Sequence, residues 1–154
     1  MVKERLRSWL DAHKTQGRAF LPDSIIYYRD GVSEGQYMKV KTEEVESIRR
    51  AYSTVAQEQA IAKQNVRITA VIAAKRHHTR FFPTHTSDQQ GKARNCMPGT
   101  LVQDKVVSPY FTDFYLQSHS GLQGTARPTH YFLLQDEIGM GATELQKFVS
   151  LDLH

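Results

Sequence analysis

The hydrophobic positions of this chain switch between two periods. Over residues 1–14, and again after Thr42, apolar side chains recur every three to four positions, which predicts amphipathic helices, with Thr42 as the N-cap of the second. Over residues 66–74 nearly every side chain is apolar and several are β-branched, which predicts a strand buried on both faces. Shorter extended segments are predicted at residues 24–28, 37–41, 100–102, 113–117 and 130–134.

The C-terminal part of the chain adds a loop and a helix. Residues 82–98 are rich in Pro, Ser, Gln, Gly and Asn, which predicts a long surface loop. A last helix is predicted to begin at Thr143, which forms a capping-box pattern with Gln146. Strands that alternate with amphipathic helices indicate a single α/β domain over residues 1–154.

The composition favours a soluble protein with a polyanionic partner. The 154 residues hold 20 Lys plus Arg against 16 Asp plus Glu, a net charge of +4. Cys96 is the single cysteine, so no intrachain disulfide can form, which fits a reducing compartment. The N-terminus has no apolar signal core, and no apolar run approaches the roughly 20 residues that span a bilayer. We therefore expect a cytoplasmic protein without a membrane segment.

Asp30 is the best-placed candidate acid. The apolar run at residues 25–28 stops at Arg29, Asp30 and Gly31, so a carboxylate stands where the predicted strand becomes a loop. Ligands in α/β sheets collect outside the carboxyl ends of the strands. The alternative is a plain turn, because Asp-Gly is also a common turn signal.

Two basic segments are candidate anion-binding sites. KRHHTR at residues 75–80 follows the predicted strand 66–74 and supplies Arg and Lys donors for phosphate. SHSGLQGTARPTHY at residues 118–131 combines glycines, which let main-chain amides approach a phosphate, with Arg127. The alternatives are a solvated basic loop and a Gly-rich hairpin loop. A zinc site of His77, His78 and His85 is weaker, because adjacent histidines rarely point at one ion.

The string YRDGVSEGQ at residues 28–36, with the two basic segments in this order, resembles the PIWI domain of eukaryotic Argonaute proteins. Its Ser33-Glu34 centre resembles the Argonaute branch rather than the Piwi branch. The resemblance implies an RNase H-like fold, a mixed sheet flanked by helices. It also implies an incomplete domain, which lacks the family's N-terminal catalytic strand and its C-terminal tail.

The resemblance implies a catalytic, metal-facing role for Asp30, which matches the family's second catalytic aspartate. In the intact protein, carboxylates would hold two Mg²⁺ or Mn²⁺ ions for cleavage of RNA, as in an endoribonuclease. The family's other metal ligands have no counterpart here, and His130 is interpreted as structural. We therefore expect that this chain alone does not cut RNA and binds no metal tightly.

The resemblance also implies partners: a small guide RNA, a target RNA and silencing proteins in RNA-mediated gene silencing (RNA interference). The residues that match guide-backbone contacts are Lys75, Arg76, Arg80, His119 and Arg127. Such contacts position RNA without reading its sequence. Two alternatives remain: a catalytically silent Argonaute that binds RNA and recruits partners, and an unrelated α/β metabolic enzyme.

Overall fold

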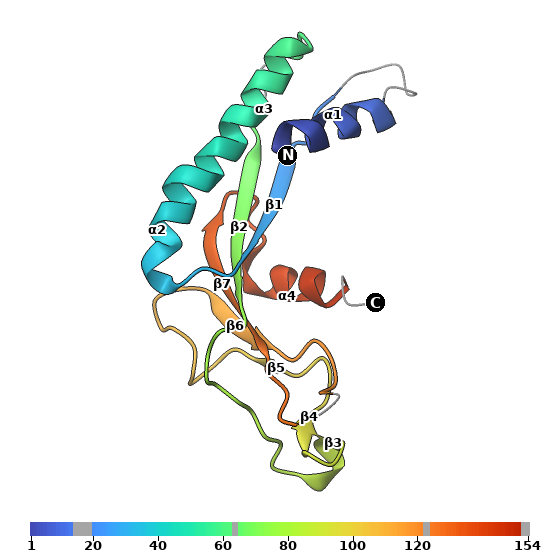
Figure 1. The fold of residues 1–154 in the computed structure, drawn as a ribbon, viewed down its shortest axis with the longest axis vertical. Coiled ribbons are helices and arrows are strands. Elements are labelled where there is room, and N and C mark those ends of the chain that lie inside the picture. The colour runs from blue at the N-terminus through green and yellow to red at the C-terminus, as the bar shows by residue number, and fades with distance from the viewer. Residues whose placement is uncertain (14–19, 63–64, 122–123, 152–154) are drawn as a thin grey trace.

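The computed structural model describes residues 1–13, 20–62, 65–121 and 124–151 (Figure 1). The α-helices are α1 (Val2–His13), α2 (Tyr37–Lys39), α3 (Glu46–Glu58) and α4 (Gly141–Leu151). The strands are β1 (Ser24–Asp30), β2 (Arg67–Ala74), β3 (Gln89–Gln90), β4 (Asn95–Cys96), β5 (Leu101–Val102), β6 (Asp113–Leu116) and β7 (Thr129–Asp136). These bounds confirm the predicted first helix as far as His13; residue 14 lies outside the described residues.

Five strands form one mixed sheet in the order β1-β2-β7-β6-β5. β1 and β2 are parallel, with Asp30 opposite Ala73, whereas β7 is antiparallel to β2, with His130 opposite Ala74. The carboxyl ends of β1 and β2 therefore lie at the same edge as the start of β7. The loops that enter or leave the sheet at this edge are brought together, although they are far apart in the sequence.

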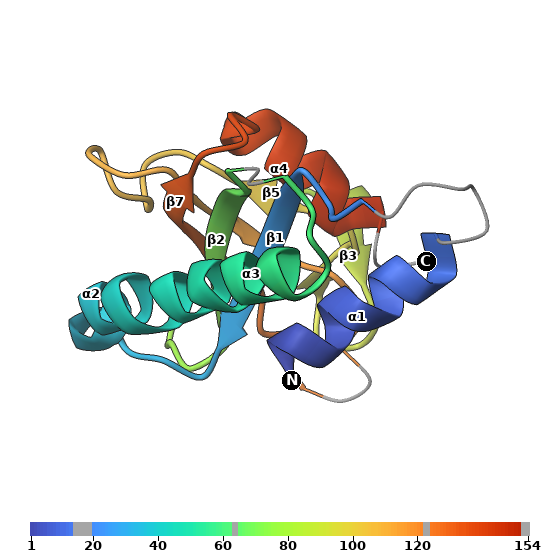
Figure 2. The same ribbon diagram turned by 90° about the horizontal axis from the view of Figure 1, so that it is seen from above.

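β2 is buried on both faces, as its unbroken apolar sequence predicts. Ile68 and Ala70 belong to a core shared with α1 and α3, whereas Val71 belongs to a second core that includes Leu145 of α4. Figure 2 shows the same arrangement, with β1 and β2 between α1 and α3 on one side and α4 on the other. Among the described residues, no helix is both long and apolar enough to cross a bilayer.

The prediction of an extended segment at residues 37–41 is wrong. The chain is helical without a break from Glu34 to Glu58, because a 3₁₀ turn (Glu34–Gln36), α2, a π-helix (Val40–Val45) and α3 follow one another. The helical stretch begins where the Ser33 amide donates to Gln36 Oε1 at 3.0 Å. Thr42 is not an N-cap: its hydroxyl donates to the Met38 carbonyl from inside the stretch.

The prediction that the last helix begins at Thr143 is also wrong, because α4 begins at Gly141. The Asp136 carboxylate accepts hydrogen bonds from the amides of Gly139 and Gly141, at 2.9 and 3.0 Å. Gln146 Nε2 donates to Gln103 Oε1 at 2.8 Å. Burial by itself would raise the pKa of Asp136. The hydrogen bonds that its carboxylate accepts outweigh this effect and lower that pKa below its ordinary value.

Candidate nucleic-acid interface

Asp30 and the first basic segment share one cavity. Asp30 is exposed at the end of β1, and one of its carboxylate oxygens accepts a hydrogen bond from the Gly31 amide at 2.6 Å. It lines a cavity of about 180 Å³ together with Ala74, Lys75 and Arg76, which lie at the end of β2. The parallel pairing of β1 and β2 thus puts the candidate acid next to two of the predicted cationic contacts.

The end of β1 is fixed from the helical side. Glu44 accepts hydrogen bonds from the Tyr27 hydroxyl, at 2.5 Å, and from Arg29 Nε, at 2.9 Å. Burial and the bond to Glu44 raise the pKa of Tyr27 to about 12, so the phenol stays protonated at neutral pH. Arg29 also donates to the Asp30 carbonyl. The strand therefore reaches Asp30 with its backbone held in place.

A second cavity, which we call the cationic cradle, lies next to the first. It measures about 710 Å³ and is lined by Lys75, His119, Ser120, Gly121, Thr125, Ala126 and Arg127. Lys75 lines both cavities, and its carbonyl accepts a hydrogen bond from Arg127 Nη1 at 3.3 Å. The structure thus brings four predicted contacts, Lys75, Arg76, His119 and Arg127, into two adjoining cavities. Leu122 and Gln123 of the same segment lie outside the described residues.

Arg80 occupies a different place from the other predicted contacts. It is half-buried and lines neither cavity, and its Nη1 donates to the carbonyls of Thr79, at 2.7 Å, and His77, at 3.3 Å. The Arg80 guanidinium therefore stabilises the backbone of segment 75–80, which also carries Lys75. A direct contact between Arg80 and RNA stays a prediction.

A layer of rings lies under the two loops. His77 Nε2 bonds to the Pro128 carbonyl at 2.9 Å, which ties segment 75–80 to Pro128 of segment 118–131. Tyr115 of β6 contacts His77 edge-on and stacks on His130, with ring centroids 5.3 and 4.3 Å apart. His130 in turn bonds to the buried Asp113 carboxylate at 2.7 Å. These contacts give His130 a structural partner, and the Asp113–His130 pair was not predicted.

His77 makes the joint between the loops sensitive to pH. Burial chiefly lowers its pKa below the ordinary value of 6.5; the bond to Pro128 opposes the shift, and electrostatic interactions with His130, Arg80 and Arg127 add to it. The folded state therefore favours neutral His77. The contribution of His77 to stability is complete above pH 6.5 and declines as the pH falls toward the lowered pKa.

We expect the wild-type chain to lose more stability between pH 7.5 and 5.5 than His77→Gln, which keeps an amide donor but does not titrate. Urea denaturation of both proteins at the two pH values measures the difference, and equal losses would contradict the assignment.

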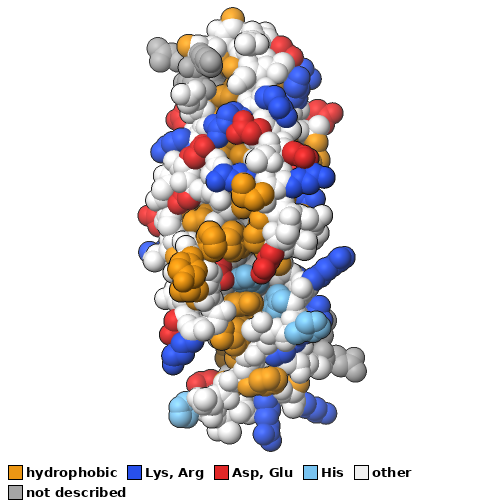
Figure 3. Space-filling model, turned by 90° about the vertical axis from the view of Figure 1, so that its left-hand side faces the viewer, with side chains coloured by type: hydrophobic (Ala, Val, Ile, Leu, Met, Phe, Trp, Pro, Cys, Tyr) orange, Lys and Arg blue, Asp and Glu red, His pale blue; other side chains and the backbone are white. Residues whose placement is uncertain are grey.

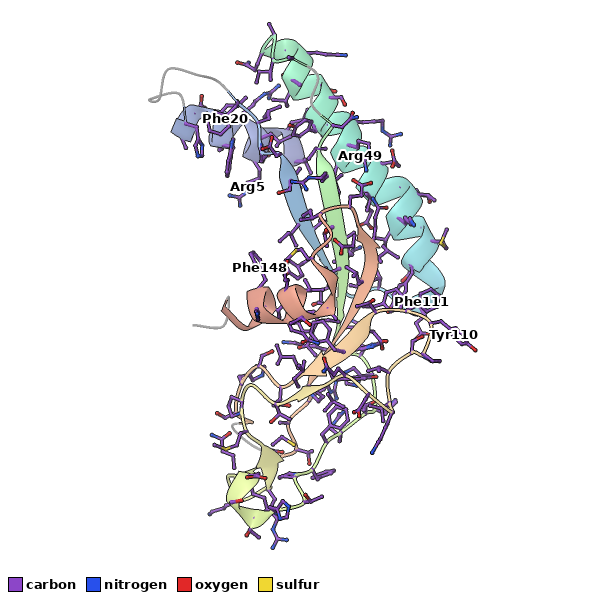
Figure 4. All side chains as sticks on the ribbon, turned by 180° about the vertical axis from the view of Figure 1, so that it is seen from behind. Arg5, Phe20, Arg49, Tyr110, Phe111 and Phe148 are labelled. Carbon is purple, nitrogen blue, oxygen red and sulfur yellow. The ribbon has the colours of Figure 1, made fainter. Side chains whose placement is uncertain are left out.

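A third cavity, of about 690 Å³, lies between α2, the loop before β6 and strand β7. Tyr37, Phe111 and Phe132 are among its lining residues, and Tyr37 and Phe111 both pack against Phe132. Phe111 and Tyr110 project from the loop in Figure 4. In Figure 3 an orange apolar patch lies on this side of the molecule, with pale-blue histidine and blue Lys or Arg side chains below it.

Asp30 is not part of a preformed metal centre among the described residues. No group of three or more His, Cys, Asp or Glu side chains within the described residues could hold a metal ion, which also disfavours the zinc site of His77, His78 and His85. Mg²⁺ keeps its waters and binds weakly to a single ligand. The described residues therefore do not by themselves fit a two-metal centre, and we assign no reaction step to them.

A mixed sheet flanked by helices, with an acid and clustered cations at one edge, is the arrangement expected of an RNase H-like domain. The family model "Piwi domain" matches residues 1–151, so the chain belongs to the Piwi domain family. The resemblance that the three motifs indicate is confirmed, and membership in this family excludes an unrelated α/β metabolic enzyme.

Known relatives agree with this assignment. The chain is 43% identical over 143 residues to protein argonaute 11 of Oryza sativa subsp. japonica and 47% identical over 125 residues to putative protein tag-76 of Caenorhabditis elegans; these matches cover 92% and 81% of the chain. It spans only 16% and 12% of those relatives.

Solved structures agree as well. The C-terminal lobe of a budding yeast Argonaute matches with a TM-score of 0.83 at 30% identity, covering 95% of this chain and 30% of that one. Kluyveromyces polysporus Argonaute, solved with a guide RNA, matches with a TM-score of 0.78 at 30% identity, covering 92% and 18%. These matches confirm the RNase H-like fold.

Proposed function

We propose that this chain is the guide-RNA-binding portion of an Argonaute-type protein that acts in small-RNA-mediated gene silencing. The cationic cradle carries the proposal, because it gathers Lys75, His119 and Arg127 from two separate segments onto one surface. The likeness to an Argonaute solved with a guide RNA supports it. A surface of cations and main-chain amides binds the backbone of a guide, whereas base pairing of the guide selects the target RNA.

Target cleavage, if the intact protein performs it, would involve Asp30. The carboxylate shares its cavity with Lys75, so a metal ligand would stand beside a residue that holds the RNA backbone. Further ligands from the rest of the protein would complete a Mg²⁺ or Mn²⁺ centre for phosphodiester hydrolysis. This chain alone would bind RNA without cutting it. The second candidate is a catalytically silent Argonaute that binds RNA and recruits silencing proteins. The cytoplasm is the proposed place of action.

Salt dependence tests the proposal. We expect the chain to bind a fluorescein-labelled single-stranded oligouridine, with an affinity that falls as salt rises. For single strands the slope of log K against log[salt] is about −0.7 for each neutralised phosphate. The two cationic side chains of the cradle, Lys75 and Arg127, therefore predict a slope of about −1.4, measured by fluorescence anisotropy. Undetectable binding at low salt, or a slope near zero, would overturn the proposal.

A further inference from the structure

Asn95 lies directly beneath the cationic cradle. It belongs to β4, inside the segment 82–98 that was predicted to be a surface loop, and only 4% of its surface is exposed. Its backbone is fixed by the β3–β4 hairpin, where Asn95 pairs with Gln90. A polar side chain that is buried in this way needs hydrogen-bond partners. Its partners lie in residues 124–127, which we call the cradle loop.

The Asn95 amide uses both of its ends on that loop. Asn95 Nδ2 donates to the Gly124 carbonyl at 3.0 Å, and Asn95 Oδ1 accepts a hydrogen bond from the Ala126 amide at 2.8 Å. A carbonyl can only accept and an amide N–H can only donate, so one orientation of the side chain satisfies both bonds. The second bond ends one residue before Arg127.

Gly121 rests on the same amide. A Cβ atom at Gly121 would lie 2.9 Å from Asn95 Nδ2, closer than ordinary contacts allow. Gly121 and Ala126 both line the cradle, and both lie against the Asn95 side chain. Asn95 itself does not line the cavity, so it acts on a ligand only through the loop.

We propose that Asn95 is a positioning residue for the RNA backbone: it holds the cradle loop so that Arg127 faces the phosphates. The inference rests on the proposed function for the identity of the ligand. Loss of the Asn95 amide would let residues 124–126 move, and Arg127 would no longer be held toward the bound strand.

The test compares Asn95→Ala with Gln90→Ala in the 154-residue chain. Gln90→Ala is the matched control, because it removes an amide from the facing strand of the same hairpin, and Gln90 does not line the cradle. We expect Asn95→Ala to weaken binding of the labelled oligouridine about tenfold and to make the salt slope less negative by about 0.7, the value of one lost phosphate contact. Gln90→Ala should change neither quantity. An Asn95→Ala protein that folds and binds like the wild type would overturn the inference.

Two further measurements separate the possible failures. In a double-mutant cycle, Asn95→Ala combined with Arg127→Ala should lower the RNA affinity little more than Arg127→Ala alone, because both changes remove the same contact; additive losses of affinity would overturn the inference.

Hydrogen exchange at the Ala126 amide can be measured without RNA. Faster exchange in Asn95→Ala than in Gln90→Ala shows that Asn95 holds residues 124–126, so a wild type that fails to bind RNA would then be a failure of the proposed function and not of the loop contact. Equal exchange counts against the role.

Discussion

Replacing Phe114 with alanine is expected to lower the free energy of unfolding by about 3–5 kcal/mol, the usual cost of a large cavity in a core. Phe114, on β6, is 1% exposed and stacks on Tyr131 of the neighbouring strand β7 with ring centroids 5.2 Å apart. It belongs to the core cluster that also contains Val71 and Leu145, so its loss opens a void between the sheet and α4. Urea denaturation followed by circular dichroism measures the effect.

The matched control is Phe82→Ala. Phe82 is 60% exposed, and the same truncation there removes few packed neighbours. We expect it to change the free energy of unfolding by less than about 1 kcal/mol. Similar losses in the two variants would mean that Phe114 is not in a close-packed core.

The sequence predicts those parts of the fold that depend on local periodicity. The apolar run of β2 predicts its burial on both faces, and the spacing of Leu6 and Leu10 predicts the buried side of α1. The start of the long helical stretch was missed, although Ser33 and Gln36 form a capping pattern. Both residues lie in the motif that indicates the family. The ring of the next residue, Tyr37, packs against Phe132 of β7. That tertiary contact has no local signal.

The candidate site divides in the same way. Asp30, Lys75 and Arg127 could be predicted because each lies in a motif at or near the end of a strand. Asn95 could not, because its partners are about thirty residues away and its segment has the composition of a loop. The Asp113–His130 pair depends on how β6 and β7 align, a register that places Tyr115 opposite His130 and Asp113 diagonally across. Only the assembled sheet supplies that information.

Reversing two charges of the cradle, with Lys75→Glu and Arg127→Glu together, is expected to weaken oligouridine binding by at least about 100-fold at low salt. The two side chains line one cavity from different segments, and Arg127 bonds to the Lys75 carbonyl. Carboxylates in their place would repel the phosphates that the ammonium and guanidinium groups attract. Both side chains are exposed, so the free energy of unfolding should change by less than about 1 kcal/mol.

The control must separate a local site from the charge of the whole chain. Lys3→Glu with Arg5→Glu changes the net charge by the same amount, also through one lysine and one arginine, on the exposed side of α1. Arg5 lies far from the β3–β4 end of the molecule in Figure 4. Electrostatic attraction between exposed groups is largely screened beyond about 10 Å at 0.1 M salt, so this variant should keep its affinity within about threefold. If both double variants lose affinity equally, RNA binding depends on overall charge and the cradle is not a site. If only the Lys75→Glu/Arg127→Glu variant loses affinity, the phosphates bind at the cradle, where segments 75–80 and 118–131 meet.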